Sequence, residues 1–186
     1  MRIVAGQFKG RPLAAPKTRA TRPTSDRARE SLFNILAHAS WAPALEGARV
    51  MDLFAGSGAL GFEALSRGAA HCLLVENARP AQMAIRANIK ALQVSAQAKL
   101  LSRSAISLGL NPDAEDLTFD IAFLDPPYNK ALVKPCLDGL IHGKWLGEQA
   151  IVVVETAADE TTDFSGWTLL NTRMSGAAQF WFLARD

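Results

Sequence analysis

Asp52-Leu53-Phe54-Ala55-Gly56-Ser57-Gly58-Ala59-Leu60-Gly61 follows a short apolar run and precedes a segment whose apolar residues have helical spacing. Its glycines are spaced as in the G-x-G-x-x-G motif, which joins a strand to a helix at nucleotide-binding turns. Glycine allows a tight turn and lets a ligand lie close to the backbone. The first N–H groups of the following helix have no partner within the helix, so they are directed at the ligand. We therefore predict a nucleotide-like ligand at this turn, the glycine loop (residues 52–61).

On both sides of the glycine loop the pattern alternates between strands and helices. Short continuous apolar runs, typical of strands buried on both faces of a parallel sheet, lie at residues 48–54, 71–75, 97–101, 119–124 and 150–155. Helices are predicted between them at 59–67, 78–92, 104–109 and 131–141. Two further strands, 167–172 and 178–183, leave no room for a crossover, which predicts an antiparallel hairpin. The predicted fold is α/β, with a doubly wound, mostly parallel seven-stranded sheet that ends in this hairpin.

The first 47 residues are predicted to form a basic N-terminal extension, followed by a ligand-binding catalytic domain over residues 48–186. Within the extension, residues 2–5 and 11–15 could pair as a hairpin. Thr24 or Ser25 can cap a helix whose first turn contains Asp26.

Charge is distributed unevenly along the chain. Residues 1–29 carry eight basic side chains and one acidic one, whereas residues 30–186 carry 12 basic and 17 acidic ones. A basic segment on a mildly acidic body favours contact with a polyanion through that segment. The alternative is a solvated tail without a function, but the apolar residues Phe8 and Leu13 argue against it.

The composition, 49% hydrophobic and 20% charged, is that of an ordinary soluble protein. No apolar stretch approaches the roughly 20 residues of a membrane span, and the first residues do not form a signal peptide. Cys72 and Cys136 lie far apart, and His38, His71 and His142 are scattered, so we predict no metal site. We expect a reducing, cytoplasmic setting.

A second motif, Asp125-Pro126-Pro127-Tyr128, closes the predicted strand 119–124 and is called the DPPY segment. The prolines stiffen the turn and remove two backbone donors, so their carbonyls can point into a pocket beside a carboxylate that only accepts hydrogen bonds. The Tyr128 ring offers a surface on which a base can stack. Such a segment can hold a planar group with an exocyclic NH2. The alternative is a Pro-Pro turn with Asp125 as a solvated cap.

Two further carboxylates bear on the identity of the ligand. Glu76 ends the strand after the glycine loop, where a carboxylate can accept hydrogen bonds from both hydroxyls of a ribose; the alternative is a cap for the helix that begins near Ala78. Asp52 suits an ammonium group, or a water bound to it, and would repel a diphosphate. These features favour S-adenosylmethionine, which has an amine, a ribose and no phosphate, over NAD.

The glycine loop, Glu76 and the DPPY segment resemble the motifs of class I amino-methyltransferases. More narrowly, the chain resembles the bacterial 16S ribosomal RNA guanine-N2 methyltransferase family. Three further stretches carry this resemblance: Arg2-Ile3-Val4-Ala5-Gly6 with Gly10-Arg11, Arg22-Pro23-Thr24-Ser25-Asp26 continuing to Asn34, and the extension of the glycine loop through Ala69. Together they cover nearly the whole chain.

The resemblance implies an S-adenosylmethionine-dependent enzyme that methylates the N2 amine of a guanine, with 16S ribosomal RNA or the small-subunit ribonucleoprotein as partner. We expect the chain to act as a monomer. The catalytic residues would be Asp125, Pro126, Pro127 and Tyr128. The cofactor-binding residues would be Asp52, Phe54, Ala55, Gly56, Ser57, Gly58, Glu76, Asn77, Ser104 and Ala105. In this reading the basic segment contacts phosphate, through Arg2, Lys9, Arg11, Arg22, Arg27 and Arg29.

One position departs from the family pattern, and other functions stay open. Such enzymes often place Asp or Asn after the third strand to hold the adenine amine, where this chain has Ser104, a weaker acceptor. The DPPY segment alone also fits adenine-N6 and cytosine-N4 methyltransferases. A nicotinamide-dependent oxidoreductase would leave the DPPY segment unexplained, and an enzyme acting on protein glutamine would more often have Asn in place of Asp125. A non-catalytic RNA-binding protein on the same scaffold is a further alternative.

Overall fold

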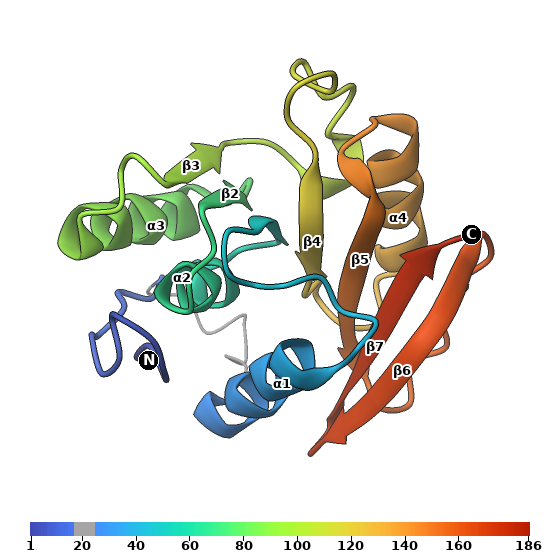
Figure 1. The fold of residues 1–186 in the computed structure, drawn as a ribbon, viewed down its shortest axis with the longest axis horizontal. Coiled ribbons are helices and arrows are strands. Elements are labelled where there is room, and N and C mark those ends of the chain that lie inside the picture. Colours follow the sequence, from blue (N-terminus) through green and yellow to red (C-terminus); the bar gives the residue numbers. More distant parts are fainter. Residues whose placement is uncertain (17–24) are drawn as a thin grey trace.

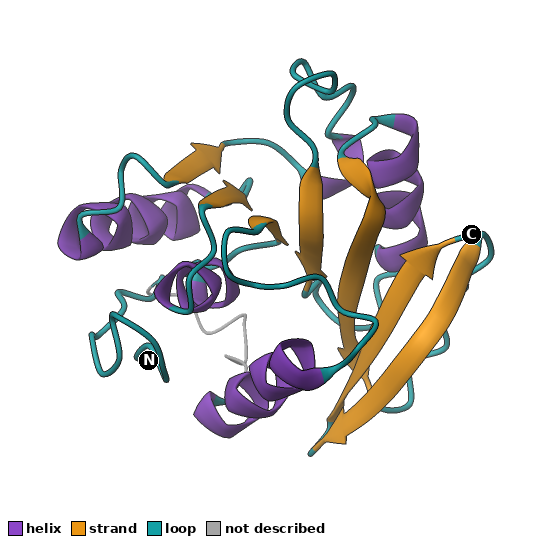
Figure 2. Cartoon of the chain, in the orientation of Figure 1, coloured by secondary structure: helices purple, strands orange, loops and turns teal. Residues whose placement is uncertain are grey.

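The computed structural model describes residues 1–16 and 25–186, and within them seven strands form one sheet (Figures 1 and 2). The strand order is β3-β2-β1-β4-β5-β7-β6. Strands β1 to β5 pair in parallel, whereas β7 pairs antiparallel with both β5 and β6. The prediction of a doubly wound, mostly parallel sheet with an antiparallel hairpin at its end is confirmed.

In chain order the elements are α1 (Asp26–His38), β1 (Arg49–Leu53), α2 (Ala59–Ser66), β2 (His71–Val75), α3 (Arg79–Leu92), β3 (Ala98–Leu101), η1 (Ala105–Ser107), β4 (Phe119–Leu124), α4 (Val133–His142), β5 (Leu146–Ala157), β6 (Trp167–Ser175) and β7 (Ala178–Arg185). The bounds predicted for β2 and β4 are those observed. The prediction of an α-helix over residues 104–109 was wrong, because that segment contains only the short 3-10 turn η1.

Helices cover both faces of the sheet, as Figure 1 shows. On one face, Leu32 of α1, Leu60 of α2 and Ile85 of α3 belong to the same buried cluster as Val50 of β1. On the other face, α4 packs in a cluster that contains Met51. Val50 and Met51 are neighbours on β1 whose side chains point to opposite faces. Burial of both faces explains why the strands are continuous apolar runs in the sequence.

Residues 1–16 lie against α2 and α3. Backbone hydrogen bonds pair residues 1–3 with 10–13 around a turn, a shorter pairing than the predicted hairpin of residues 2–5 and 11–15. A single antiparallel bridge joins Arg2 to Pro12. The buried carboxylate of Glu63, on α2, accepts hydrogen bonds from the N–H groups of Val4 (2.7 Å) and Ala5 (3.0 Å). Hydrogen bonds from backbone N–H groups of this segment to α2 therefore hold the segment in place. Its basic side chains extend from a backbone whose position is fixed. The division into residues 1–47 and 48–186 stays a prediction.

Helix α1 begins after Ser25, one of the two residues predicted to cap it. The Ser25 hydroxyl accepts a hydrogen bond from the N–H of Ala28 at 3.1 Å, and Asp26 lies in the first turn. Thr24, the other predicted cap, lies outside the described residues. Among the helices that the structure describes, none has the length and apolar character needed to cross a membrane.

Candidate active site

The predicted site residues meet at the carboxyl ends of four adjacent strands. Strands β3, β2, β1 and β4 are neighbours in the sheet, and their carboxyl ends lead respectively to Ser104, Glu76, the glycine loop and Asp125. Open α/β sheets bind ligands at this edge, where the direction of the connections reverses. The topology thus brings together the two motifs that lie about seventy residues apart in the sequence.

The glycine loop turns sharply from β1 into α2. Gly58 caps α2 in the left-handed conformation, with φ of +79°. A Cβ atom at this position would lie 2.5 Å from Cε2 of Phe62 and 2.7 Å from Cδ2 of Leu74. Both the backbone angle and the packing therefore require glycine. Phe54, just after β1, also has a positive φ of 62°, an uncommon conformation for a non-glycine residue that often marks a functional turn.

Glu76 ties the glycine loop to the start of α3. One carboxylate oxygen, Oε2, accepts a hydrogen bond from the N–H of Gly56 (2.8 Å), and Oε1 accepts one from the N–H of Ala78 (2.7 Å). The interpretation of Glu76 as a cap for the following helix is thus correct for Oε1. The bond to Gly56 places the same carboxylate beside the glycine loop, where a ribose contact is predicted.

Asp52 is buried under the glycine loop, with 2% of its surface exposed. Its Oδ2 accepts a hydrogen bond from the N–H of Gly61 at 2.9 Å. Burial, together with the nearby negative charge of Glu76, raises the pKa of Asp52 to about 7. A carboxylate so poorly solvated gains from an adjacent cation, which would favour its ionised form. The site can therefore accommodate an ammonium group.

The DPPY segment follows β4 directly. Asp125 is half-buried and its N–H points to the carbonyl of Leu53, at the end of β1, at 3.5 Å. Pro126 is buried, whereas Pro127 is exposed. The hydroxyl of Tyr128 donates a hydrogen bond to Oε1 of Glu155 at 2.7 Å. This bond fixes the orientation of the half-buried Tyr128 ring.

Glu155 and Asn88 are two residues of the site that the sequence analysis missed. Glu155 is 5% exposed and follows the apolar part of β5, as Glu76 follows β2. An acid at the end of a buried apolar run is the sequence signal that could have indicated it. Asn88 is 2% exposed, and its amide nitrogen donates to the carbonyls of Ser57 (2.9 Å) and Ala14 (3.0 Å). A polar residue on the apolar face of α3 could have indicated such a link between the glycine loop and the N-terminal segment.

The remaining predicted cofactor contacts lie around this edge. Ala55 and Ser57 are buried within the glycine loop, and Asn77 is exposed next to Glu76. Ser104 and Ala105 lie at the start of η1, where the carbonyl of Ser104 accepts from the N–H of Ser107. Across the described residues, no group of three or more His, Cys, Asp or Glu side chains is placed to hold a metal ion.

The predicted RNA-contacting residues fall into two groups. Lys9, Arg11 and Arg27 are exposed, and so is Arg2, which pairs with Asp26 at 3.0 Å. Arg29 is 1% exposed, and its Nη2 donates to the carbonyl of Arg2 and to Asp26, both at 2.7 Å. Arg29 thus holds the N-terminal segment against α1, and we withdraw it from the predicted phosphate contacts. Arg22 lies outside the described residues.

Similarity to known proteins extends over almost the entire chain. Residues 1–184 match the family model described as conserved hypothetical protein 95. The ribosomal RNA small subunit methyltransferase D of Escherichia coli K12 is 34% identical over 188 residues, spanning 100% of this chain and 90% of that protein. The putative rRNA methyltransferase YlbH of Bacillus subtilis is 38% identical over 83% of this chain and 82% of its own length. Among solved structures, the putative methyltransferase yhhF from Escherichia coli superposes with a TM-score of 0.82 at 33% identity, covering 100% and 98% of the two chains.

Proposed function

This chain belongs to the conserved hypothetical protein 95 family, and from that premise we propose that it is an S-adenosylmethionine-dependent ribosomal RNA methyltransferase. Its acceptor is the exocyclic N2 amine of a guanine in 16S ribosomal RNA. The observation that carries this proposal is the adjacency of the glycine loop and Asp125 at the ends of β1 and β4, which pair in parallel. A site for a cofactor therefore adjoins a carboxylate suited to an NH2 group.

The chain's own residues fit S-adenosylmethionine. The glycine loop gives close access to the backbone, and the carboxylates of Asp52 and Glu76 lie beside it. In this proposal Asp52 faces the cofactor's ammonium group and Glu76 its ribose, while Asn77, Ser104 and Ala105 line the adenine side. The carboxylate of Asp52, under the glycine loop, would repel a diphosphate, which argues against a nicotinamide cofactor. When bound, S-adenosylmethionine supplies an electrophilic methyl group on a sulfonium centre.

The DPPY segment acts on the acceptor nitrogen. The lone pair of a guanine N2 is delocalised into the ring, which makes this nitrogen a poor nucleophile. Asp125 and the carbonyl of Pro126 accept hydrogen bonds from its two N–H groups, so that the nitrogen becomes pyramidal and its lone pair is directed away from the ring. The same acceptors stabilise the positive charge that develops on nitrogen. Asp125 and bulk water are the two candidate acceptors for the proton that leaves nitrogen after transfer.

The target guanine must leave its stack to reach this segment. Stacking on Tyr128, whose ring Glu155 holds in place, would offset about 1–3 kcal/mol of that cost. Pro127, exposed beside it, shapes the same surface. The exposed cations of the N-terminal region, Arg2, Lys9, Arg11 and Arg27, contact phosphate and position the RNA without reading its sequence. We place the enzyme in the cytoplasm, where its RNA substrate is found.

The proposal is tested by incubating the purified chain with methyl-labelled S-adenosylmethionine and 16S ribosomal RNA, both as naked RNA and in the small subunit. Nucleoside analysis should show label in N2-methylguanosine. Label in N6-methyladenosine or N4-methylcytidine would assign the DPPY segment to another base. Tight binding of RNA without methyl transfer would favour a non-catalytic RNA-binding protein.

A further inference from the structure

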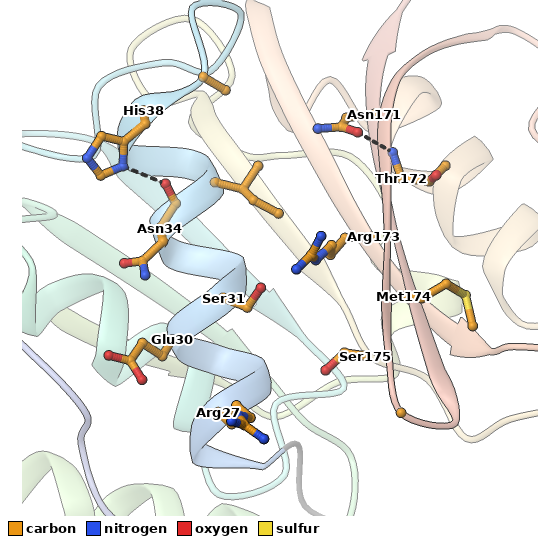
Figure 3. Close-up of a pocket in the computed structure, with 13 residues that line it drawn as sticks. Arg27, Glu30, Ser31, Asn34, His38, Asn171, Thr172, Arg173, Met174 and Ser175 are labelled. Atoms are coloured by element: carbon orange, nitrogen blue, oxygen red, sulfur yellow. Dashed lines mark hydrogen bonds between the residues drawn. The ribbon is translucent and has the colours of Figure 1, made fainter.

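A groove of about 890 Å³ separates α1 from the β6–β7 hairpin, and it is called the α1–hairpin groove (Figure 3). We propose that this groove holds the single-stranded RNA next to the target guanosine, with Arg173 of β6 as a phosphate contact. The inference rests on the proposed function, which it extends from the target base to the flanking nucleotides. The β6–β7 hairpin plays no part in the cofactor and base contacts described above.

The register of the sheet connects the groove to the DPPY segment. Arg173 of β6 lies opposite Phe180 of β7, and Phe180 lies opposite Glu155 of β5. Residues opposite one another on neighbouring strands direct their side chains to the same face, so Arg173 and Glu155 share one face of the sheet. Glu155 in turn accepts the hydrogen bond from Tyr128. Two strand spacings, about 10 Å, therefore separate the backbone of Arg173 from that of the residue that orients the proposed stacking surface.

The two walls of the groove present donors toward each other. On β6, Asn171, Arg173 and Ser175 alternate with residues of the other face, and Figure 3 shows all three directed toward α1. On α1, Arg27 and Ser31 are one helical turn apart on the side of the hairpin. Cations and hydroxyls that face each other across an open groove suit a chain of phosphates and riboses.

The charges of the groove favour an anion. Arg27 and Arg173 are exposed, and neither forms an ion pair with a described residue. The groove contains one acidic residue, Glu30, whose carboxylate points away from the hairpin in Figure 3. Arg2, which pairs with Asp26 beside Arg27, continues the basic surface into the N-terminal segment. The cations thus form a path from the N-terminal segment along α1 to the hairpin.

The decisive experiment compares Arg173→Ala with Arg185→Ala. Arg185 is an exposed cation at the opposite end of the same hairpin, opposite Trp167, and serves as the matched control. Affinity for 16S ribosomal RNA freed of its proteins is measured at several salt concentrations. Arg173→Ala should weaken binding several-fold and reduce the slope of log affinity against log salt by about 1. It should raise KM for RNA with little change in kcat, while S-adenosylmethionine affinity and melting temperature stay unchanged in both variants.

The outcomes separate this inference from the function on which it rests. If the wild-type chain methylates 16S ribosomal RNA but Arg173→Ala behaves like Arg185→Ala, the groove inference is overturned and the function stands. If Arg173→Ala aggregates but binds RNA as the wild type does, Arg173 protects the sheet edge from pairing with other chains, and the inference is likewise overturned. A loss confined to the assembled subunit, absent with naked RNA, would identify a protein occupant and also overturn the inference. A wild-type chain that neither binds nor methylates RNA would overturn both. Arg173→Glu should give a larger loss than Arg173→Ala, since it places a like charge next to phosphate.

Discussion

The two halves of the proposed active site are built differently. On the cofactor side, the carboxylates of Asp52 and Glu76 are 2% and 9% exposed and accept hydrogen bonds from the backbone N–H groups of Gly61, Gly56 and Ala78. On the acceptor side, Pro126 is buried, Asp125 and Tyr128 are half-buried and Pro127 is exposed. The cofactor half is thus part of the folded core, whereas the acceptor half lies at the edge of the core and is partly exposed.

This difference implies that the two halves respond differently to substitution. Changes on the cofactor side should alter stability and cofactor affinity together, because the same hydrogen bonds hold the loop and shape the site. Changes on the acceptor side should alter catalysis with little effect on folding. The distinction is contradicted if variants of both halves lose stability, cofactor affinity and catalytic activity in the same proportions.

The largest effect is expected for Asp125→Ala, on the acceptor side. Loss of the acceptor for the N2 hydrogens should lower kcat by a factor of about 100–1,000 or more, in line with the removal of other groups that stabilise charge in a transition state. Affinity for S-adenosylmethionine, measured by calorimetry, and melting temperature should stay near the wild-type values. Asp159→Ala, at an exposed acid in the turn after β5, is the control. Equal losses of activity and cofactor affinity in Asp125→Ala would place Asp125 in the cofactor half.

Asp52 should make the stability of the cofactor half depend on pH. Its pKa in the folded chain is about 7, against an ordinary 3.8. Between these values the folded state keeps a proton that the unfolded state has lost, so the free energy of unfolding falls as pH rises. At about 1.4 kcal/mol for each pKa unit, the fall is on the order of a few kcal/mol.

Urea unfolding of the wild type and of Asp52→Asn from pH 4 to 7 measures this contribution. The variant should lose less stability over that interval, because its amide does not titrate. Cofactor affinity of the wild type should increase as pH rises toward 7 and Asp52 ionises beside the ammonium group, and the variant should lack this increase. Parallel pH profiles of the two proteins would contradict the burial of a titrating carboxylate under the glycine loop.

Gly58→Ala tests whether the glycine loop is shaped by packing as well as by backbone angle. Gly47 has nearly the same φ, +77° against +79°, but a Cβ at Gly47 would meet no described atom within 4 Å. Gly47→Ala should therefore cost about 1 kcal/mol for the left-handed conformation alone. Gly58→Ala adds the contacts with Phe62 and Leu74 and should cost roughly 2–4 kcal/mol in total. Thermal unfolding and cofactor titration of both variants would show whether the second cost is real.

Much of the fold was predictable because the parallel strands β1, β2, β4 and β5 are buried on both faces over their apolar runs. The bounds predicted for β2 and β4 are those observed, and an acid ends each apolar run, Glu76 after β2 and Asp125 after β4. Strand β5 extends four residues before its predicted start, because Leu146 pairs with Phe119 across an irregular register that no local pattern reveals. The N-terminal pairing is shorter than the predicted hairpin, and the segment is held in place by Glu63, about sixty residues away.

The site was predictable where a role depends on strand ends and unpredictable where it depends on tertiary neighbours. An acid or a glycine turn after an apolar run places Asp52, Glu76 and Asp125 at one edge of the sheet without knowledge of the structure. Arg29 has the same local signature as the exposed Arg27, yet it is buried, because the carbonyl of Arg2 and Asp26 accept its hydrogen bonds. Charge counts alone do not distinguish a cation that contacts RNA from one that secures a segment.

Glu76→Gln should affect stability and cofactor affinity together. The side-chain amide keeps one oxygen but places NH2 where the second N–H group must be accepted, so either Gly56 or Ala78 loses its partner. Loss of a hydrogen bond to a charged group, here from the half-buried Gly56 or the exposed Ala78, costs about 1–3 kcal/mol. Both the free energy of unfolding and the affinity for S-adenosylmethionine should fall. Glu160→Gln, at a carboxylate with a single long bond of 3.4 Å to the N–H of Ala157, is the control. A normal melting temperature with weakened cofactor binding would mean that the backbone bonds of Glu76 do not stabilise the loop.

Tyr128→Phe should give the smallest effect and separates the ring of Tyr128 from its hydroxyl. The variant keeps the stacking surface and loses the hydrogen bond to Glu155 at 2.7 Å, a contribution of about 1 kcal/mol to the orientation of the ring. We expect a few-fold decrease in kcat, with unchanged cofactor affinity. Tyr128→Ala also removes the ring, which should cost a further 1–3 kcal/mol or so in binding of the flipped base. If the two variants lose equal activity, the hydroxyl and Glu155, rather than the aromatic surface, form the essential part of the acceptor half.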